Sequence, residues 1–341
     1  MTNEERIAAL QAFGYSEGEA EFLCLAALHS GYLLRRQYRD FLGQSPGWVD
    51  DSLVRKLLAL GHATEELASR RTRLYHLCSR TLYAAIDQFD NRHRRRRPPF
   101  AIKAKLMALD FVLANPGNIY FPTEEEKMTY FTRELGFQKE VLPTKIYRSP
   151  DGQSVTHRYF VDKFPIFIAP VAQPDPPPVV SFCFVDEGSI STPGFQTYLT
   201  QYARLFQALG SFQLVYIATQ EKAFDHARKT LDHHLHGRSH HGRLLEYLKL
   251  ENLYQTKRFD CLDVQKLERL RMLRKQFQAD AYSGLLAAWN QGGEAAVSRI
   301  LNSGKAGLQP LKCDFKTCLL RHDYDIFGYS KNQQNRPGRS K

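Results

Sequence analysis

The stretch Ser16–Leu77 constrains the fold most, because three helix patterns in it are followed by two strand patterns. Ser16 is a suitable N-cap residue, and apolar residues then recur at helical spacing until Gly31. A short amphipathic helix is expected to end at Gly43. A third helix is predicted over Ser45–Leu60, with a buried face made of Val49, Leu53, Leu57 and Leu60.

Two runs of alternating polar and apolar residues follow this third helix. His62–Leu67 and Thr72–Leu77 have the period of strands, and the residues between them include Arg70 and Arg71. This pattern is typical of a β-hairpin with a basic tip. Helix, short helix, helix and hairpin is the element order of a winged helix, so residues 1–90 are predicted to form a winged helix-turn-helix domain.

A winged helix predicts contact with double-stranded DNA. Its third helix fits the major groove, and its hairpin can follow a neighbouring groove or the backbone. The residues expected to make this contact are Arg35, Arg36, Trp48, Ser52, Arg55, Lys56, Arg70, Arg71 and Arg73. The alternative is a winged helix that binds protein. Asp50 and Asp51 lie on the third helix, and residues 1–90 contain twelve Asp and Glu against ten Lys and Arg.

Residues 91–100 are predicted to be an arginine-rich linker. All but one of the residues from Arg92 to Arg97 are arginines, and two prolines follow. Such a segment is expected to be an exposed arm rather than a packed element. Its candidate contacts with phosphates or a narrow minor groove are Arg94, Arg95, Arg96 and Arg97. The alternative is a solvated hinge without a ligand.

Residues 101–235 alternate between strand and helix patterns, which predicts an α/β, nuclease-like domain with a mixed sheet. The run 179–185 is rich in β-branched and aromatic residues, as a buried central strand is. Further strands are expected over 156–162, 164–169 and 212–218, and helices over 103–114, 195–209 and 223–234.

The remainder of the chain is predicted to be helical and basic. Residues 236–330 form this region, and residues 331–341 are expected to be a disordered tail. The histidines within 233–241 are interpreted as part of a polar loop between helices rather than as a metal site. The whole chain is therefore expected to be a multidomain protein of the α+β or α/β class.

Three acidic residues, Asp162, Asp186 and Glu187, follow predicted strands of the α/β domain. Nucleases of the restriction-endonuclease type place carboxylates at such strand ends to hold Mg²⁺, together with a lysine that helps to activate water. That lysine is missing here, since Gly188 and Ser189 occupy its expected position. We therefore expect a nuclease-like scaffold without a catalytic site or cofactor. The alternative is a metal-dependent DNA endonuclease that uses these three carboxylates and Mg²⁺.

The net charge of the 341-residue chain is +11, which favours a polyanionic partner or an acidic membrane surface. No apolar run reaches the roughly 18 residues that a membrane helix needs. The N-terminus has no apolar signal core, and the six cysteines form no Cys-x-x-Cys pair. We therefore expect a cytoplasmic protein with reduced thiols and no membrane partner.

Two segments resemble the replication-relaxation family of winged-helix proteins from plasmids and integrative elements. One is Ser16–Leu77, which ends in Arg-Leu-Tyr-His-Leu. The other is Phe184–Ser189, an apolar strand with an acidic turn, followed by a helix that contains Tyr198 and Tyr202. The resemblance covers roughly residues 13–220. It implies a DNA-binding role in replication, mobilisation or transcriptional regulation of a mobile genetic element.

Three functional hypotheses stay open. The first is a non-catalytic protein that binds double-stranded DNA by sequence or by structure. It could bind paired half-sites as a homodimer, and it could also bind partner proteins of the mobile element. The second is the metal-dependent endonuclease. The third is an assembly factor whose winged helix binds protein.

Overall fold

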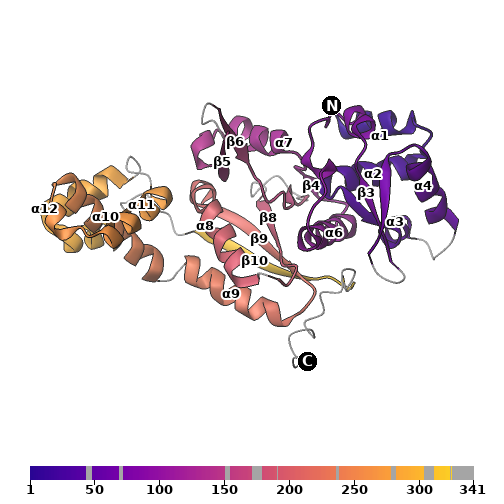
Figure 1. Cartoon of the computed structure of the whole chain (residues 1–341). Coiled ribbons are helices and arrows are strands. Elements are labelled where there is room, and N and C mark those ends of the chain that lie inside the picture. Colours follow the sequence, from indigo (N-terminus) through magenta and orange to yellow (C-terminus); the bar gives the residue numbers. More distant parts are fainter. Residues whose placement is uncertain are drawn as a thin grey trace, which may run out of the picture.

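A computed structural model describes the chain as a mixed α/β protein with helices and a mixed sheet, which confirms the predicted class at this level. An N-terminal unit, a central sheet and a C-terminal group of helices follow one another across the molecule (Figure 1). The predicted tail, 331–341, lies outside the described residues. Those are 1–43, 48–68, 72–149, 154–170, 179–189, 191–235, 238–277, 282–302, 311–322 and 324.

The N-terminal unit packs helices around a small antiparallel sheet, whose strand order is β1-β3-β2. The three helices expected after Ser16 and the β2–β3 hairpin are present, whereas β1 was not predicted. The elements are α1 (Asn3–Gln11), α2 (Glu17–His29), β1 (Tyr32–Leu34), α3 (Arg35–Leu42), α4 (Trp48–Ala59), β2 (Ala63–Leu67), β3 (Arg73–Leu77) and α5 (Arg80–Ala85).

Helix α2 begins where its capping residues require. Ser16 Oγ accepts a hydrogen bond from the Glu19 N–H at 3.3 Å, and Glu19 Oε2 accepts one from the Ser16 N–H at 2.8 Å. This reciprocal pair satisfies two N–H groups that would otherwise lack a partner within the helix. Ser45, where the third helix was predicted to begin, lies outside the described residues.

The buried face of α4 differs from the predicted one. Leu53 and Leu57 are buried as expected, and Val54 joins them. The prediction for Leu60 is wrong, because this side chain is 46% exposed. Helix α4 ends at Ala59, and the chain then turns towards β2, so Leu60 no longer follows the helical face.

The arginine-rich linker is packed rather than free. It contains a short 3₁₀ helix, η1 (Arg92–Arg94), and leads into α6 (Pro99–Ala114). His93 is buried, and its carbonyl oxygen lies 3.0 Å from His76 Nε2 on β3. The Arg97 N–H donates to the Tyr32 hydroxyl at 2.9 Å. The prediction of a wholly exposed arm is wrong, because buried backbone contacts attach the segment to the N-terminal sheet.

The central sheet has the strand order β10-β9-β8-β7-β4. Strands β8, β9 and β10 are parallel, whereas β7 is antiparallel to β8 and β4 is antiparallel to β7. This order confirms the mixed sheet. The strands are β4 (Ile119–Tyr120), β7 (Ile166–Ile168), β8 (Val180–Val185), β9 (Ser211–Ala218) and β10 (Lys312–Leu319).

Alternate residues of β8 belong to two different cores, because successive side chains of a strand point to opposite faces. Phe182 and Phe184 pack in a core with α8 (Ser191–Leu209) and α9 (Lys222–Leu235). Cys183 and Val185 pack in a second core with α6 and with residues of β1 and β3. Helix α6 therefore lies between the sheet and the N-terminal unit.

A small antiparallel hairpin, β5 (Thr144–Arg148) and β6 (Val155–Tyr159), stands apart from the central sheet. It follows α7 (Glu124–Thr129), which begins with a capping box between Thr123 and Glu126. The helix continues as a π-helical turn, η2 (Tyr130–Glu134), before the 3₁₀ turn η3 (Lys139–Val141).

The C-terminal helices form a separate group with its own core (Figure 1). They are α10 (Arg238–Gln255), η4 (Phe259–Cys261), α11 (Val264–Gln276) and α12 (Ser283–Asn302). The chain then returns to the central sheet as β10, a strand within the region that was predicted to be helical. The loop predicted at 233–241 is also wrong, because its described residues belong to α9 and α10.

Within the described ranges, no helix combines the length and the apolar character needed to cross a membrane.

Candidate nucleic-acid interface

The candidate interface is centred on the outer face of α4. Leu53, Val54 and Leu57 turn inward, so Arg55 is exposed on the opposite side and Ser52 is half-buried at its edge. Arg55 Nε donates to the Asp51 carbonyl at 3.3 Å, a weak contact along its own helix. Helix α4 begins at Trp48, whose side chain lies outside the described part of the structure, as do Arg70 and Arg71.

Ion pairs connect this face of α4 to α3 and to the hairpin. Arg35 on α3 pairs with Asp51 on α4, and Arg35 Nε also donates to the Tyr75 hydroxyl at 3.0 Å. That hydroxyl donates to Glu65 at 2.8 Å, and Glu65 in turn pairs with Arg73. The network joins α3, α4, β2 and β3, and Asp51 is balanced by an arginine of a neighbouring helix. The sequence predicted neither Tyr75 nor Glu65 as part of this face.

Lys56 is directed towards α2 rather than outwards. Its ammonium lies 2.6 Å from Glu19 Oε2 and donates to the Gly14 carbonyl at 3.2 Å. Glu19 is buried and also caps α2. Lys56 therefore attaches α4 to the start of α2.

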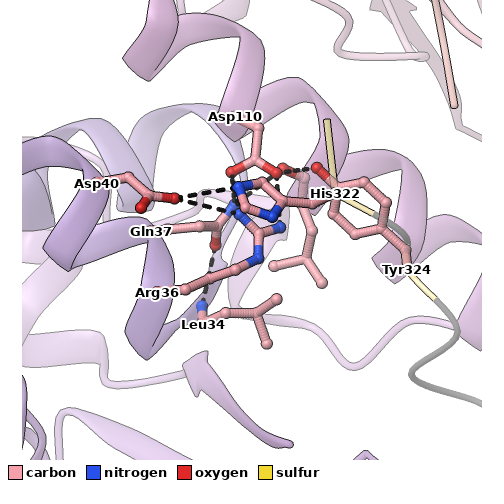
Figure 2. Close-up of polar contacts among 8 residues, drawn as sticks. Leu34, Arg36, Gln37, Asp40, Asp110, His322 and Tyr324 are labelled. Carbon is pink, nitrogen blue, oxygen red and sulfur yellow. Dashed lines mark hydrogen bonds and ion pairs between the residues drawn. The ribbon is translucent and has the colours of Figure 1, made fainter. Parts of the chain in front are cut away.

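Arg36 also makes internal contacts (Figure 2). Its two terminal nitrogens donate to the Asp110 carboxylate of α6 at 3.0 and 2.7 Å. Its guanidinium lies 5.2 Å from the ring centroid of Tyr324 in the C-terminal segment, and the Tyr324 hydroxyl bonds to Asp110. The structure separates Arg36 from the α4 face and assigns it to packing between α3 and α6.

The linker arginines divide into two groups. Arg95 and Arg96 are exposed, and Arg96 forms an ion pair with Glu66 of β2 at 3.2 Å. Arg94 and Arg97 are half-buried, and their Nε atoms have no hydrogen-bond partner within the described part of the chain. Arg95 and Arg96 thus remain beside the hairpin, while Arg97 turns inward.

The three acidic candidates for a nuclease site are occupied by other contacts. Asp162 accepts hydrogen bonds from the Tyr202 hydroxyl at 2.8 Å and the Phe164 N–H at 2.9 Å. Asp186 accepts from the Tyr216 hydroxyl at 2.7 Å and the Gly188 N–H at 2.8 Å. Glu187 bonds to Ser189.

These hydrogen bonds stabilise the turns in which the three acidic residues lie. Burial raises the pKa of Asp162, and the nearby Lys127 lowers it by a smaller amount. No group of three or more His, Cys, Asp or Glu that could hold a metal ion occurs among the residues that the structure describes.

Comparisons with protein-family models, with curated proteins and with solved structures found no match to this chain. The candidate interface therefore rests on its own geometry.

Proposed function

We propose that this chain is a non-catalytic protein that binds double-stranded DNA through a winged helix in residues 1–90. The observation that carries the proposal is the element order of this unit. Helices α2, α3 and α4 are followed by the β2–β3 hairpin, and β1 closes the hairpin into a three-stranded antiparallel sheet. Helix α4 buries one face and leaves Arg55 on the other, as a helix that enters a groove requires.

The proposed contacts come from α4 and from the segments beside it. Arg55 would approach base edges or phosphates, and Arg95 and Arg96 would meet the backbone near the hairpin. Arg70 and Arg71, which lie outside the described residues, remain expected phosphate contacts. Arg36 and Lys56 are left out of this set because their partners, Asp110 and Glu19, are largely buried, whereas Arg96 is 77% exposed beside Glu66. Such phosphate contacts release counterions, so affinity should depend steeply on salt.

We further propose that the process served is replication, mobilisation or transcriptional regulation of a mobile element. The resemblance to the replication-relaxation family supports this proposal. In the segment that carries this resemblance, Asp186 accepts hydrogen bonds from the Gly188 N–H and the Tyr216 hydroxyl, and the ring centroids of Tyr198 and Tyr202 lie 4.3 Å apart on the following helix. Dimeric binding to paired half-sites belongs to the same proposal.

Fluorescence anisotropy with a labelled duplex of random sequence, titrated at several KCl concentrations, tests DNA binding. We expect affinity to fall steeply with salt, and the R55A and R95A/R96A variants to weaken binding. R258A is the matched control, since Arg258 is an exposed arginine of the distant C-terminal helices. Absence of duplex binding at low salt would instead favour the protein-binding assembly factor.

A plasmid-nicking assay with Mg²⁺ or Mn²⁺ separates this proposal from the endonuclease. Cleavage that disappears in the D186A variant would contradict a non-catalytic role. We expect no cleavage, because tyrosine hydroxyls and backbone N–H groups already bind both aspartates.

A further inference from the structure

A cavity of about 940 Å³ lies where the linker, α6, α7, the β5–β6 hairpin and the end of β8 come together. Its wall includes five cationic side chains from separate parts of the chain. They are Arg92, Arg97, Lys105, Lys127 and Lys163. This cavity contains neither α4 nor the β2–β3 hairpin, so it is distinct from the proposed DNA interface.

The wall holds eight Lys and Arg residues in all, against six Asp and Glu residues. Within the described part of the chain, none of the five forms an ion pair with Asp or Glu. Their nitrogens instead use neutral oxygens. Lys105 donates to the Ser30 carbonyl at 3.0 Å, Lys127 to the Phe164 carbonyl at 2.9 Å, and Lys163 to Asn91 Oδ1 at 3.1 Å.

The arginines that line the cavity also have unused donors. The Nε atoms of Arg92, Arg97 and Arg158 are shielded from water and have no hydrogen-bond partner within the ranges that the structure describes. Buried donors without partners are uncommon in folded proteins and often mark a missing ligand or ion. Acceptors supplied by an anion would satisfy them.

Four of the six acidic residues of the cavity wall contact other groups: Asp90 lies 3.6 Å from Arg158, and Glu187 bonds to Ser189. Asp162 is bound by Tyr202 and by the Phe164 N–H. Glu124 accepts from the Tyr159 N–H at 2.9 Å and lies 3.8 Å from Arg158. The eight basic and six acidic residues of the lining leave a formal excess of two positive charges.

Two further observations support a built site. Lys163 and Phe160 adopt left-handed backbone conformations, with φ of 59° and 48°, and such strain is concentrated at binding sites. The pKa of Lys163 also reflects its burial in this wall. Loss of water, followed by the charges of Lys127 and Arg97, lowers the pKa of Lys163 to about 7.

Aromatic rings complete the lining. Phe89 and Phe100 belong to the cavity wall and are 71% and 52% exposed. The Arg92 guanidinium lies 5.5 Å from the ring centroid of Tyr147. The volume is within the range of small-molecule sites and larger than an inorganic ion needs. A nucleotide combines a flat base with charged phosphates. The exposed aromatic rings offer a surface for the base, and the neighbouring cations offer donors for the phosphates.

We propose that this cavity binds a small phosphorylated ligand of nucleotide type, with its phosphates on Arg92, Arg97, Lys105 and Lys163 and its base against the exposed aromatic rings.

Isothermal titration calorimetry of the full chain with ATP, inorganic pyrophosphate and adenosine tests this proposal. We expect ATP to bind most tightly, pyrophosphate more weakly, and adenosine at least tenfold more weakly than ATP. The R97M and K163M variants should each weaken ATP binding at least tenfold. If either fails to fold by circular dichroism, R92Q is the substitute, since Arg92 is half-buried.

R95A is the matched control, because Arg95 lies in the same arginine run but is exposed and outside the cavity. It should bind ATP within twofold of the wild type. The proposal is overturned if none of the phosphate compounds binds, if R97M and K163M bind ATP like R95A, or if an oligonucleotide binds at these residues and ATP does not.

Discussion

Arg36 and Asp110 form a two-pronged ion pair between α3 and α6, with N–O distances of 3.0 and 2.7 Å (Figure 2). Asp110 also accepts a hydrogen bond from Gln37 Nε2 at 2.8 Å and one from the Tyr324 hydroxyl. One carboxylate thus holds two side chains of α3 and a residue from the C-terminal segment. Because α6 also packs on the central sheet, Asp110 connects the proposed DNA-binding unit to the rest of the protein.

We expect D110N to destabilise the protein by about 2–4 kcal/mol, because the mostly buried Arg36 guanidinium then keeps only the longer ion pair to the exposed Asp40 among the described residues. Arg36 and Asp110 side chains are 19% and 10% exposed. D40N is the control, since Asp40 lies 3.7 Å from Arg36 but is 52% exposed, and it should cost less than about 1 kcal/mol. Urea unfolding followed by circular dichroism measures both. Equal effects of the two variants would contradict this assignment.

Gly31 is required where the linker meets the N-terminal sheet. Its φ is +77°, and a Cβ there would lie 2.6 Å from His93 Cβ and 2.8 Å from the His93 carbonyl oxygen. G31A should therefore destabilise the protein by at least about 2 kcal/mol through strain and overlap. Gly43 has a φ of +63° but open space around its missing Cβ, so G43A should cost only about 1 kcal/mol. Thermal unfolding compares the two variants.

Local signals made much of this fold predictable. Ser16 and Thr123 each precede a glutamate by three residues, which is the sequence pattern of a capping box. The β-branched and aromatic composition of 180–185 indicates a buried strand. Strand β10 was missed although polar and apolar residues alternate in its first half. It follows a long helical region, and its pairing partner, β9, lies far away in sequence.

Contacts between distant residues were not predictable. The arginine run looked like an exposed arm because nothing nearby in sequence reveals that His93 is buried against β3. The cavity cations Lys105, Lys127 and Lys163 sit on three separate elements, and each alone resembles an ordinary surface lysine. Only the tertiary structure brings them together.

Lowering the pH should destabilise the protein, because His29 takes up a proton when the chain unfolds. Burial and the nearby Lys127 lower the pKa of His29 from 6.5 to about 3. Between these pH values the unfolded chain binds a proton that the folded chain does not, so stability is lost as the pH falls from 6.5 towards 3. The largest slope from this one group is about 1.4 kcal/mol per pH unit.

Urea unfolding of H29F at pH 8 and pH 5 checks this expectation. Phenylalanine keeps the ring that His29 packs against Tyr120, with centroids 5.3 Å apart. The variant should lose about 1–2 kcal/mol less than the wild type on going from pH 8 to pH 5. H157Q, at an exposed histidine, should follow the wild type. A parallel response of H29F and the wild type would show that His29 does not titrate on unfolding.

Lys163 should produce a pH dependence in the neutral to alkaline range. Loss of water and the charges of Lys127, Arg97 and Arg92 lower its pKa from 10.5 to about 7, while Glu124 opposes the shift. Above pH 7 the folded chain releases a proton that the unfolded chain retains up to about pH 10. The unfolded state then binds more protons, so this group makes stability rise with pH from 7 upwards.

K163M should remove this contribution, since methionine keeps the length of the side chain without its charge. Measured by urea unfolding between pH 7 and 8.5, its stability should rise less with pH than that of the wild type, by up to about 1.4 kcal/mol per pH unit. K316M, at an exposed lysine of β10, is the control and should keep the wild-type slope. Identical slopes for K163M and K316M would mean that Lys163 keeps its ordinary pKa, and that the cations around the cavity do not interact strongly.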